Sequence, residues 1–281
     1  MKKKLDNSFT VLLPIFQRDD LFSNFSKVLQ SIYQNSVLPS DVFLLIDGKL
    51  NNNFYRLINL QQKKYNFKIL KSEKVGLANI LNKGINKVST KWIARMDGDD
   101  ICEKNRFKNS LKFMNFDYDL FGGQIKEIDS KSDFYFVKEV PCSSEKIIKM
   151  IKYRNPFNHM TVFYKTDFAK KIGGYPDLYL KEDYAFWIKF ICNGAKIGNM
   201  NKIVVKVKTD GMYDRRSGFK YCISEFILQK ILLQSKLTNV FCSLFICPAR
   251  ILIHLLPRSL KKFFYISLLR KKYDSWKRSN S

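Results

Sequence analysis

The sequence lacks the cysteine patterns of zinc sites and of disulfide-stapled proteins. Its cysteines are scattered, with no CxxC pair and no Cys/His ligand spacing, at Cys102, Cys142, Cys192, Cys222, Cys242 and Cys247. We therefore expect no zinc site. Dispersed thiols are typical of a reducing compartment, so a cytoplasmic setting is favoured over a disulfide framework.

Acidic residues are scarce, because 25 Asp and Glu stand against 50 Lys and Arg and give a formal net charge of +25. Such an excess fits nucleic acid, an anionic membrane surface or anionic substrates as partner. A drift of composition toward Lys, Asn and Ile would raise the charge without function, and both explanations stay open. Near the C-terminal end the lone acid Asp274 is surrounded by bases, namely Arg250, Arg258, Lys261, Lys262, Arg270, Lys271, Lys272, Lys277 and Arg278.

Long apolar runs are also missing. The stretch Val240–Leu256 is strongly apolar, but it is interrupted by Pro248 and Arg250, whereas a membrane span needs about 20 apolar residues. An interfacial helix bordered by basic residues is favoured over a core helix pair. The run Phe9–Phe16 follows basic residues but has no small-residue cleavage site, so we expect a first buried strand and no export signal.

A chain of 281 residues that is 46% hydrophobic can fold as one large or two small domains. Apolar strands are expected over 9–13, 41–46, 67–70 and 92–96, and they alternate with helices over 21–34, 52–65 and 77–86. This alternation predicts an α/β fold with a parallel sheet covered on both faces. Ligands bind beyond the carboxyl ends of such strands, where Asp47, Asp97 and Asp99 are expected.

The second half of the chain is expected to mix short elements and then become helical. Strands are expected over 134–140 and 161–164, and helices over 144–152, 184–192, 221–237, 240–256 and 260–272. We therefore divide the chain into a catalytic domain, 1–217, and a C-terminal basic amphipathic helical region, 218–281. There is no internal repeat and no low-complexity linker.

The most informative motif is the run Arg95-Met96-Asp97-Gly98-Asp99-Asp100, directly after the fourth strand. Three carboxylates within four positions repel one another. Hard divalent cations take oxygen ligands and share them with substrate phosphates, so a metal site explains the run. An acidic turn would also explain it. The neighbouring motifs shift the balance toward the metal.

Those motifs are Gly76-Leu77-Ala78-Asn79, Asn155–Thr161, Gly173-Gly174-Tyr175 with Glu182-Asp183-Tyr184-Ala185-Phe186-Trp187, and Arg215-Arg216-Ser217-Gly218. In this order, with the acidic run, they resemble inverting nucleotide-sugar glycosyltransferases of family 2, from about Phe9 to Lys272. The closest resemblance is to the bacterial exopolysaccharide, capsule and O-antigen branch, such as amylovoran-type enzymes. The resemblance implies a GT-A fold, in which a Rossmann-like mixed sheet binds the nucleotide.

The resemblance implies a donor site made of Pro14, Ile15, Asp47, Gly76, Arg95, Asp97 and Asp99. Asp99 would be the main ligand of Mn²⁺ or Mg²⁺, with Asp97 beside it, because a metal that bridges both phosphates improves the leaving group. Phe16-Gln17-Arg18 stands where many members have a Tyr-Asn pair. An Asp-Gly turn for Asp47, a turn glycine at Gly76 and an ion pair for Arg95 remain alternatives.

The resemblance also assigns the acceptor side. Asp183 would be the general base, with Glu182 in support, although an acidic pair also favours a helix N-terminus. The acceptor or its diphosphate would meet Asn158, His159, Trp187, Arg215 and Arg216. For His159 a satisfied core histidine, and for the two arginines a solvated basic turn, are the alternatives.

We therefore expect a metal-dependent hexosyl- or N-acetylhexosaminyltransferase that moves a sugar, from a UDP donor, to a polyprenyl-diphosphate-linked saccharide. It would lie peripherally on the anionic inner face of a bacterial plasma membrane. A nucleotidyltransferase is a rival, but Pro14–Gln17 lacks the glycines of its phosphate loop. A nucleic-acid-binding protein is a second rival, opposed by the acidic run at the ligand edge.

Overall fold

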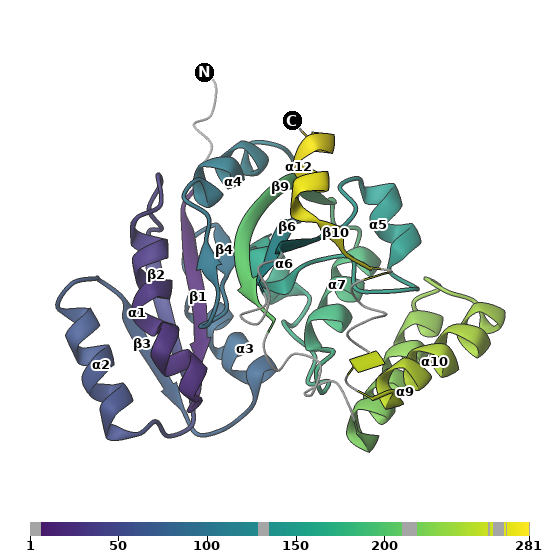
Figure 1. The fold of residues 1–281 in the computed structure, drawn as a ribbon, viewed down its shortest axis with the longest axis horizontal. Helices are drawn as coiled ribbons and strands as arrows, with labels where there is room; N and C mark the ends of the chain where they lie inside the picture. Colours follow the sequence, from purple (N-terminus) through teal and green to yellow (C-terminus); the bar gives the residue numbers. More distant parts are fainter. Residues whose placement is uncertain are drawn as a thin grey trace.

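The computed structural model describes residues 7–128, 135–209, 218–257, 259–260, 267 and 269–280. Its centre is a mixed sheet in the order β10-β7-β6-β8-β4-β1-β2-β3, with β9 paired to β6 and to the short β5. Helix α2 and the pair α9 and α10 lie at opposite ends of the molecule (Figure 1). The predicted α/β fold with a mixed sheet and a helical C-terminal part is confirmed.

The first half is the predicted parallel unit. Strands β1 (Phe9–Ile15), β2 (Asp41–Asp47), β3 (Lys68–Ser72) and β4 (Trp92–Arg95) are joined by α1 (Asp19–Tyr33), α2 (Asn52–Gln62) and α3 (Leu77–Lys87). Strand β1 runs past Pro14, where the sequence had it end. The Leu12 carbonyl accepts from the Met96 N–H, the last bond on the β4 side, so the missing N–H of Pro14 falls beyond the end of β4.

The second half adds strands of both directions. Strands β6 (Leu120–Ile128), β7 (Tyr135–Lys138), β8 (Phe163–Lys165) and β9 (Ile197–Lys208) extend the sheet, and β5 (Ile101–Cys102) pairs with β9. The connecting helices are α4 (Arg106–Met114), α5 (Ser144–Met150), α6 (Thr166–Lys171) and α7 (Glu182–Cys192). The strand expected over 161–164 begins two residues later, because a 3₁₀ turn, η1 (His159–Thr161), precedes it.

Two apolar cores cover the two faces of the sheet. Neighbouring residues of β1 point to opposite faces, so Leu13 packs with Phe25 in one core and Leu12 packs with Trp187 and Leu228 in the other. Leu228 belongs to α9, so the C-terminal helices contribute to the second core. The apolar runs of the central strands, which read as buried on both faces, are thereby explained.

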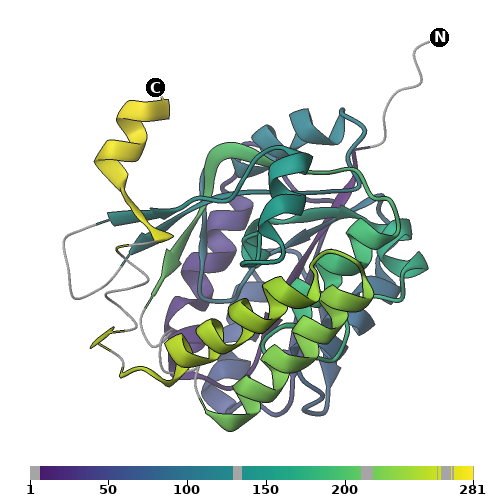
Figure 2. The same ribbon diagram turned by 90° about the vertical axis from the view of Figure 1, so that its right-hand side faces the viewer.

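Helices α9 (Phe219–Gln234) and α10 (Val240–Leu255) form a hairpin. The two helices lie side by side in front of the sheet in Figure 2. The buried Glu225 of α9 pairs with Lys181 Nζ at 2.7 Å and with Arg250 Nε of α10 at 2.8 Å. We call Lys181, Glu225 and Arg250 the hairpin clamp. Among the described residues, no helix is both long and apolar enough to span a bilayer.

The last described segment returns to the sheet. Lys271–Lys272 forms β10, antiparallel to β7, and α12 (Tyr273–Asn280) follows. The helix expected over 260–272 is therefore wrong at its end. A buried ion pair between Arg270 Nη2 and Glu127 Oε1, at 2.8 Å, holds the segment against the open edge of β7, whose backbone groups would otherwise lack partners.

Candidate active site

The acidic run lies at the carboxyl end of β4, as the topology requires. Oxygens of Asp97, Asp99 and Asp100, which we call the acidic cluster, lie within 4.8 Å of one another. A Cβ on Gly98 would lie 2.9 Å from Ile15 Cγ2 and 3.1 Å from the Pro14 carbonyl oxygen. The glycine therefore lets the acidic turn approach the end of β1, and it brings Pro14 and Ile15 to the same edge.

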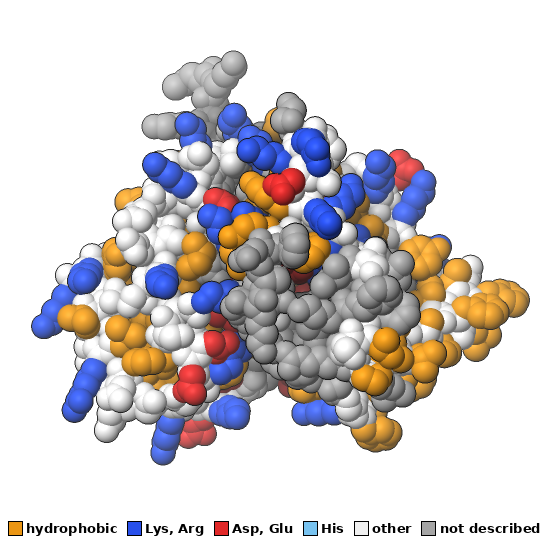
Figure 3. Space-filling model, viewed as in Figure 1, with side chains coloured by type: hydrophobic (Ala, Val, Ile, Leu, Met, Phe, Trp, Pro, Cys, Tyr) orange, Lys and Arg blue, Asp and Glu red, His pale blue; other side chains and the backbone are white. Residues whose placement is uncertain are grey.

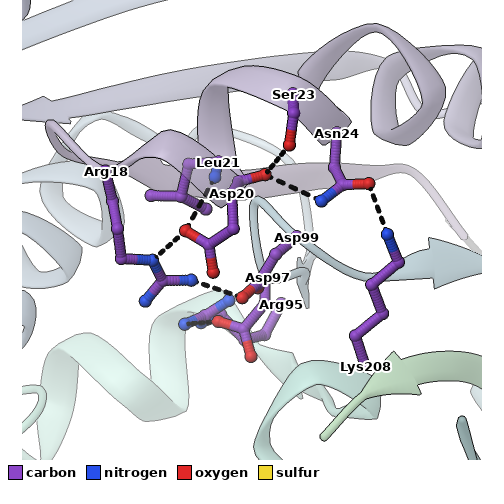
Figure 4. A network of polar contacts seen from close by, with 9 residues as sticks. All are labelled: Arg18, Asp20, Leu21, Ser23, Asn24, Arg95, Asp97, Asp99 and Lys208. Carbon is purple, nitrogen blue, oxygen red and sulfur yellow. Dashed lines mark hydrogen bonds and ion pairs between the residues drawn. The ribbon is translucent and has the colours of Figure 1, made fainter. Parts of the chain in front are cut away.

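Two arginines balance part of the cluster's charge (Figure 4). Arg95, which is 1% exposed, contacts Asp97 Oδ1 through Nη2 at 2.6 Å. Arg18, at the start of α1, reaches across to Asp99 and also pairs with Asp20. Arg18 is a member of the site that the sequence did not single out for a role, although its position after the first strand could have signalled it.

Asp100 is the buried member of the acidic cluster. Its side chain is buried, and Oδ2 has no hydrogen-bond partner among the described residues. Burial raises the pKa of Asp100 well above its ordinary value of 3.8, and the charges of Asp97 and Asp99 raise it further. Crowded carboxylate oxygens of this kind fit a hard divalent cation, which supplies the missing positive charge.

Asp47, at the end of β2, holds the entrance to α3. Its Oδ1 accepts from the Val75 N–H at 2.7 Å and its Oδ2 from the Gly76 N–H at 3.1 Å. Gly76 has φ +89°, and a Cβ there would meet nothing within 4 Å. The glycine is therefore required by its backbone conformation and leaves open space at the helix N-terminus.

The Gly173–Tyr175 turn is fastened to α3 by one side chain. Asn82 Nδ2 donates to the Tyr175 carbonyl at 2.8 Å, and the Tyr175 N–H donates to Asn82 Oδ1 at 2.7 Å. A Cβ on Gly174 would lie 2.2 Å from that Oδ1, so only glycine allows this approach. The Tyr175 hydroxyl lies 3.0 Å from His159 Nε2, and the turn thereby fixes the histidine.

Glu182 and Asp183 form the first turn of α7, whose N-terminus favours negative charge. Asn155 Nδ2 donates to Asp183 Oδ2 at 2.7 Å, and this orienting contact was not predicted. Burial and the neighbouring Asp183 raise the pKa of Glu182 to about 7. Arg95 and Asp97 also act on that pKa, so the pair on α7 and the acidic cluster share one electrostatic site.

The other acceptor candidates differ in exposure. Burial, together with the charge of Arg95, lowers the pKa of His159 to about 4, so its ring is neutral at pH 7. Asn158 is buried and donates to the Gly123 carbonyl at 2.9 Å, and Trp187 is fully buried against Phe157. Both support the floor beneath His159. Arg215 and Arg216 lie outside the described residues.

Comparison with known proteins gives a consistent result. The model of the family described as "Glycosyl transferase family 2" matches residues 10–171. An Escherichia coli UDP-Gal:α-D-GlcNAc-diphosphoundecaprenol β-1,3-galactosyltransferase is 34% identical over 94% of this chain and 97% of its own length. The amylovoran biosynthesis glycosyltransferase AmsE of Erwinia amylovora is 27% identical over 92% of this chain and 97% of its own.

The likeness extends to a solved fold. The structure of Staphylococcus aureus TarS residues 1–349, in complex with UDP-GlcNAc, superposes with a TM-score of 0.64 at 16% identity, covering 93% of this chain and 76% of that one. At this identity the match speaks for the fold alone. It agrees with the mixed sheet and flanking helices described above.

Proposed function

Because the chain belongs to glycosyltransferase family 2, we propose that it transfers a sugar from a nucleotide donor, a UDP-sugar, to a saccharide carried on a polyprenyl diphosphate. The galactosyltransferase relative, whose name specifies UDP-Gal and a diphosphoundecaprenol acceptor, supports this choice. The product would enter a bacterial surface polysaccharide such as O-antigen, capsule or exopolysaccharide. The observation that carries the proposal is the acidic cluster beside the carboxylate pair on α7.

In this reaction Asp99 and Asp97 would hold Mn²⁺ or Mg²⁺, and Asp100, with its orphaned oxygen, fits the same cation. The bound metal supplies neutralisation of the leaving diphosphate. Arg95 fixes Asp97 by its ion pair and brings its own positive charge to the donor side. Pro14 and Ile15 end β1 and Gly76 precedes α3, at the edge of the sheet where the nucleoside would lie.

The acceptor chemistry falls to α7. Asp183, held by Asn155, would take the proton from the acceptor hydroxyl as its oxygen attacks the anomeric carbon, which gives inversion in one step. Glu182, whose pKa is raised to about 7 by burial and by the neighbouring Asp183, would be partly protonated near pH 7 and so would add less than a full negative charge beside the base. The neutral His159 would line the pocket beside it.

We assign the catalytic part to residues 1–217 and the acceptor-membrane part to 218–281. The enzyme would work at the cytoplasmic face of the plasma membrane, bound peripherally. The clamp supports a functional link between the two parts, because Lys181 directly precedes Glu182 and pairs with Glu225 of α9.

The test is turnover of a panel of UDP- and GDP-sugars with Mn²⁺ and a short-chain prenyl-diphosphate GlcNAc acceptor, measured as nucleotide release and product mass. We expect one UDP-sugar to be consumed. Asp99→Asn and Asp183→Asn should each lower the rate by at least about a hundredfold, while the exposed Asp117→Asn leaves it unchanged. Full activity in Asp183→Asn would remove the base assignment, and no turnover with any donor would contradict the proposed reaction.

A further inference from the structure

The outer side of the α9–α10 hairpin is an exposed apolar surface with no covering element among the described residues. On α9 the exposed positions recur at helical spacing, and α10 repeats the pattern. The members of this surface, which we call the apolar face, are Phe219, Ile223, Phe226, Ile227, Val240, Phe241, Leu244, Phe245 and Leu252. The view in Figure 3 shows hydrophobic side chains gathered at the edge over these helices.

The exposure of these side chains is extreme for large hydrophobics. Phe219 is 82% exposed, Phe241 78% and Phe245 77%. Single exposed hydrophobics need no explanation, but a contiguous group of phenylalanines on two packed helices marks an interaction site. Burying each ring would be strongly favourable, so the surface calls for an occupant.

The charges around the face select the occupant. Between residues 218 and 257 the only acidic residue is Glu225, and it is 0% exposed because the clamp encloses it. Every exposed charge on the hairpin is therefore positive, contributed by Lys220, Lys230 and Lys236. Phenylalanine on one face with lysine at its borders, and no carboxylate, is complementary to anionic lipid headgroups above an acyl layer.

We infer that the apolar face is the surface by which this protein rests on an anionic lipid bilayer, with the phenylalanines inserted at the headgroup boundary. The inference rests on the proposed function for its purpose, since a lipid-linked acceptor must be met at the bilayer. It places the contact on residues 219–252, which include most of the segment 240–256 where the sequence favours an interfacial helix and add the exposed side of α9.

The opposite side of the same hairpin reaches the catalytic pair. Tyr221 accepts a hydrogen bond from Lys181 Nζ at 2.7 Å, and Arg250 lies over the ring of Tyr184 at 5.5 Å. Lys181 and Tyr184 flank Glu182 and Asp183 in the chain. The buried ion pairs of the hairpin clamp therefore join the proposed membrane-binding helices to the first turn of α7, which carries the proposed base. With the apolar face on a bilayer, this connection would hold the base at a set distance from the lipid surface.

The experiment is vesicle flotation of the full chain with phosphatidylcholine vesicles that contain or lack phosphatidylglycerol. We expect wild-type protein to float with the anionic vesicles. The double variant Phe241→Ser/Phe245→Ser should bind about a hundredfold more weakly, roughly tenfold per ring. The matched control is Phe116→Ser. Phe116 is an exposed phenylalanine outside the hairpin, so this variant should float like wild type. Adding salt should weaken the lysine contribution and leave the aromatic one.

Activity separates this inference from the proposed function. The double variant should keep wild-type turnover of a water-soluble short-chain acceptor and lose it on an acceptor embedded in vesicles. Absence of turnover in wild type with intact flotation would overturn the function but leave the docking surface. Equal flotation of the double variant and wild type would overturn the docking surface. A wild-type dimer that becomes monomeric in the double variant without any vesicle binding would also overturn it, in favour of a second copy of the chain.

Discussion

The acidic cluster and the hairpin clamp are two groups of buried charges built in opposite ways. In the clamp one carboxylate, Glu225, lies between two cations. In the acidic cluster three carboxylates lie together; Arg18 pairs with Asp99 and Arg95 with Asp97, and Arg95 and Arg106 partly offset the rise in the pKa of Asp100. The clamp therefore encloses a single carboxylate between cations, whereas the cluster brings three carboxylates close together.

The pKa shifts have opposite directions for the same reason. Burial alone would raise the pKa of Glu225, but Arg250 and Lys181 outweigh it and the pKa is lowered. For Asp100 burial raises the pKa, and two further carboxylates add to the rise. The lowered pKa of Glu225 reflects its two cationic neighbours, and the raised pKa of Asp100 reflects burial among carboxylates, an environment that a bound cation would make more favourable.

The largest expected effect comes from a substitution in the hairpin clamp. Glu225→Gln removes the carboxylate that pairs with Lys181 and Arg250, so we expect a loss of about 3–5 kcal/mol in the free energy of unfolding. Urea unfolding followed by circular dichroism measures it. Because the folded-state pKa of Glu225 is lowered, the difference from wild type should be full above its ordinary value of 4.5 and shrink as the pH falls below it.

The control for this prediction is Glu145→Gln. Glu145 pairs with Lys149 one helical turn away, and both side chains are mostly exposed. Exposed pairs of this kind contribute about 0.3–0.5 kcal/mol. If Glu225→Gln unfolded at the same urea concentration as Glu145→Gln, the clamp would not hold the hairpin.

The second prediction tests whether the acidic cluster binds a metal ion. Asp100→Asn replaces a buried carboxyl group, whose charged form is disfavoured by burial and by Asp97 and Asp99, with a neutral amide, so the metal-free protein should be no less stable than wild type. Its affinity for Mn²⁺ should fall by about 10- to 100-fold, because a carboxylate near the cation is lost. Unfolding and metal titration calorimetry in the presence of UDP measure the two quantities. A metal-free variant as unstable as Glu225→Gln would mean that Asp100 is a structural anion.

This contrast also explains how much the sequence could predict of the site. The acidic cluster is contiguous in the chain, and the buried strand before it places it at the ligand edge of the sheet. The cluster and its position could therefore both be predicted from the sequence. The members of the clamp come from the loop before α7, from α9 and from α10. Only the tertiary fold brings them together, and no local pattern marks Lys181 or Glu225 as partners. Asn155 was within a recognised motif, but its contact with Asp183 depends on the same kind of long-range packing.

The fold divides along a similar line. The strands of the parallel half are continuous apolar runs, and the sequence located each to within a few residues. Strand β9 has no regular alternation, since Val204 and Val205 are adjacent and both buried, and its pairing with β6 shifts register around Gln124. Its length therefore follows from pairing with β6 and not from a local pattern. Strand β10 consists of two lysines, whose place in a sheet is decided by the edge of β7.

A smaller effect sharpens the charge balance within the acidic cluster. Arg18 pairs with Asp99, an oxygen donor that the cation would also use. Arg18→Gln should therefore raise the affinity for Mn²⁺ about two- to fivefold, since partly exposed pairs contribute up to about 1 kcal/mol. Arg56→Gln, which removes the same charge from the exposed side of α2, should leave the affinity unchanged. Weaker metal binding in Arg18→Gln would mean that the arginine orients Asp99 for the cation.

The smallest effect concerns the pKa of His159, on which Arg95, Asp97 and Asp183 all act. Burial and Arg95 lower its pKa to about 4, although Asp183 and Asp97 act in the opposite direction. The ring should stay neutral from pH 8 to about pH 5, and an NMR titration of the imidazole signal that disappears in His159→Gln measures this. The unfolded chain binds a proton on this histidine near pH 6.5, whereas the folded chain binds it only near pH 4. His159 therefore has no effect on stability above about pH 6.5, and its destabilising contribution grows as the pH falls from 6.5 toward 4. A titration midpoint near 6.5 would show that Asp183 and Asp97 offset both burial and Arg95 at this ring, and His159 would then not be held neutral in the site.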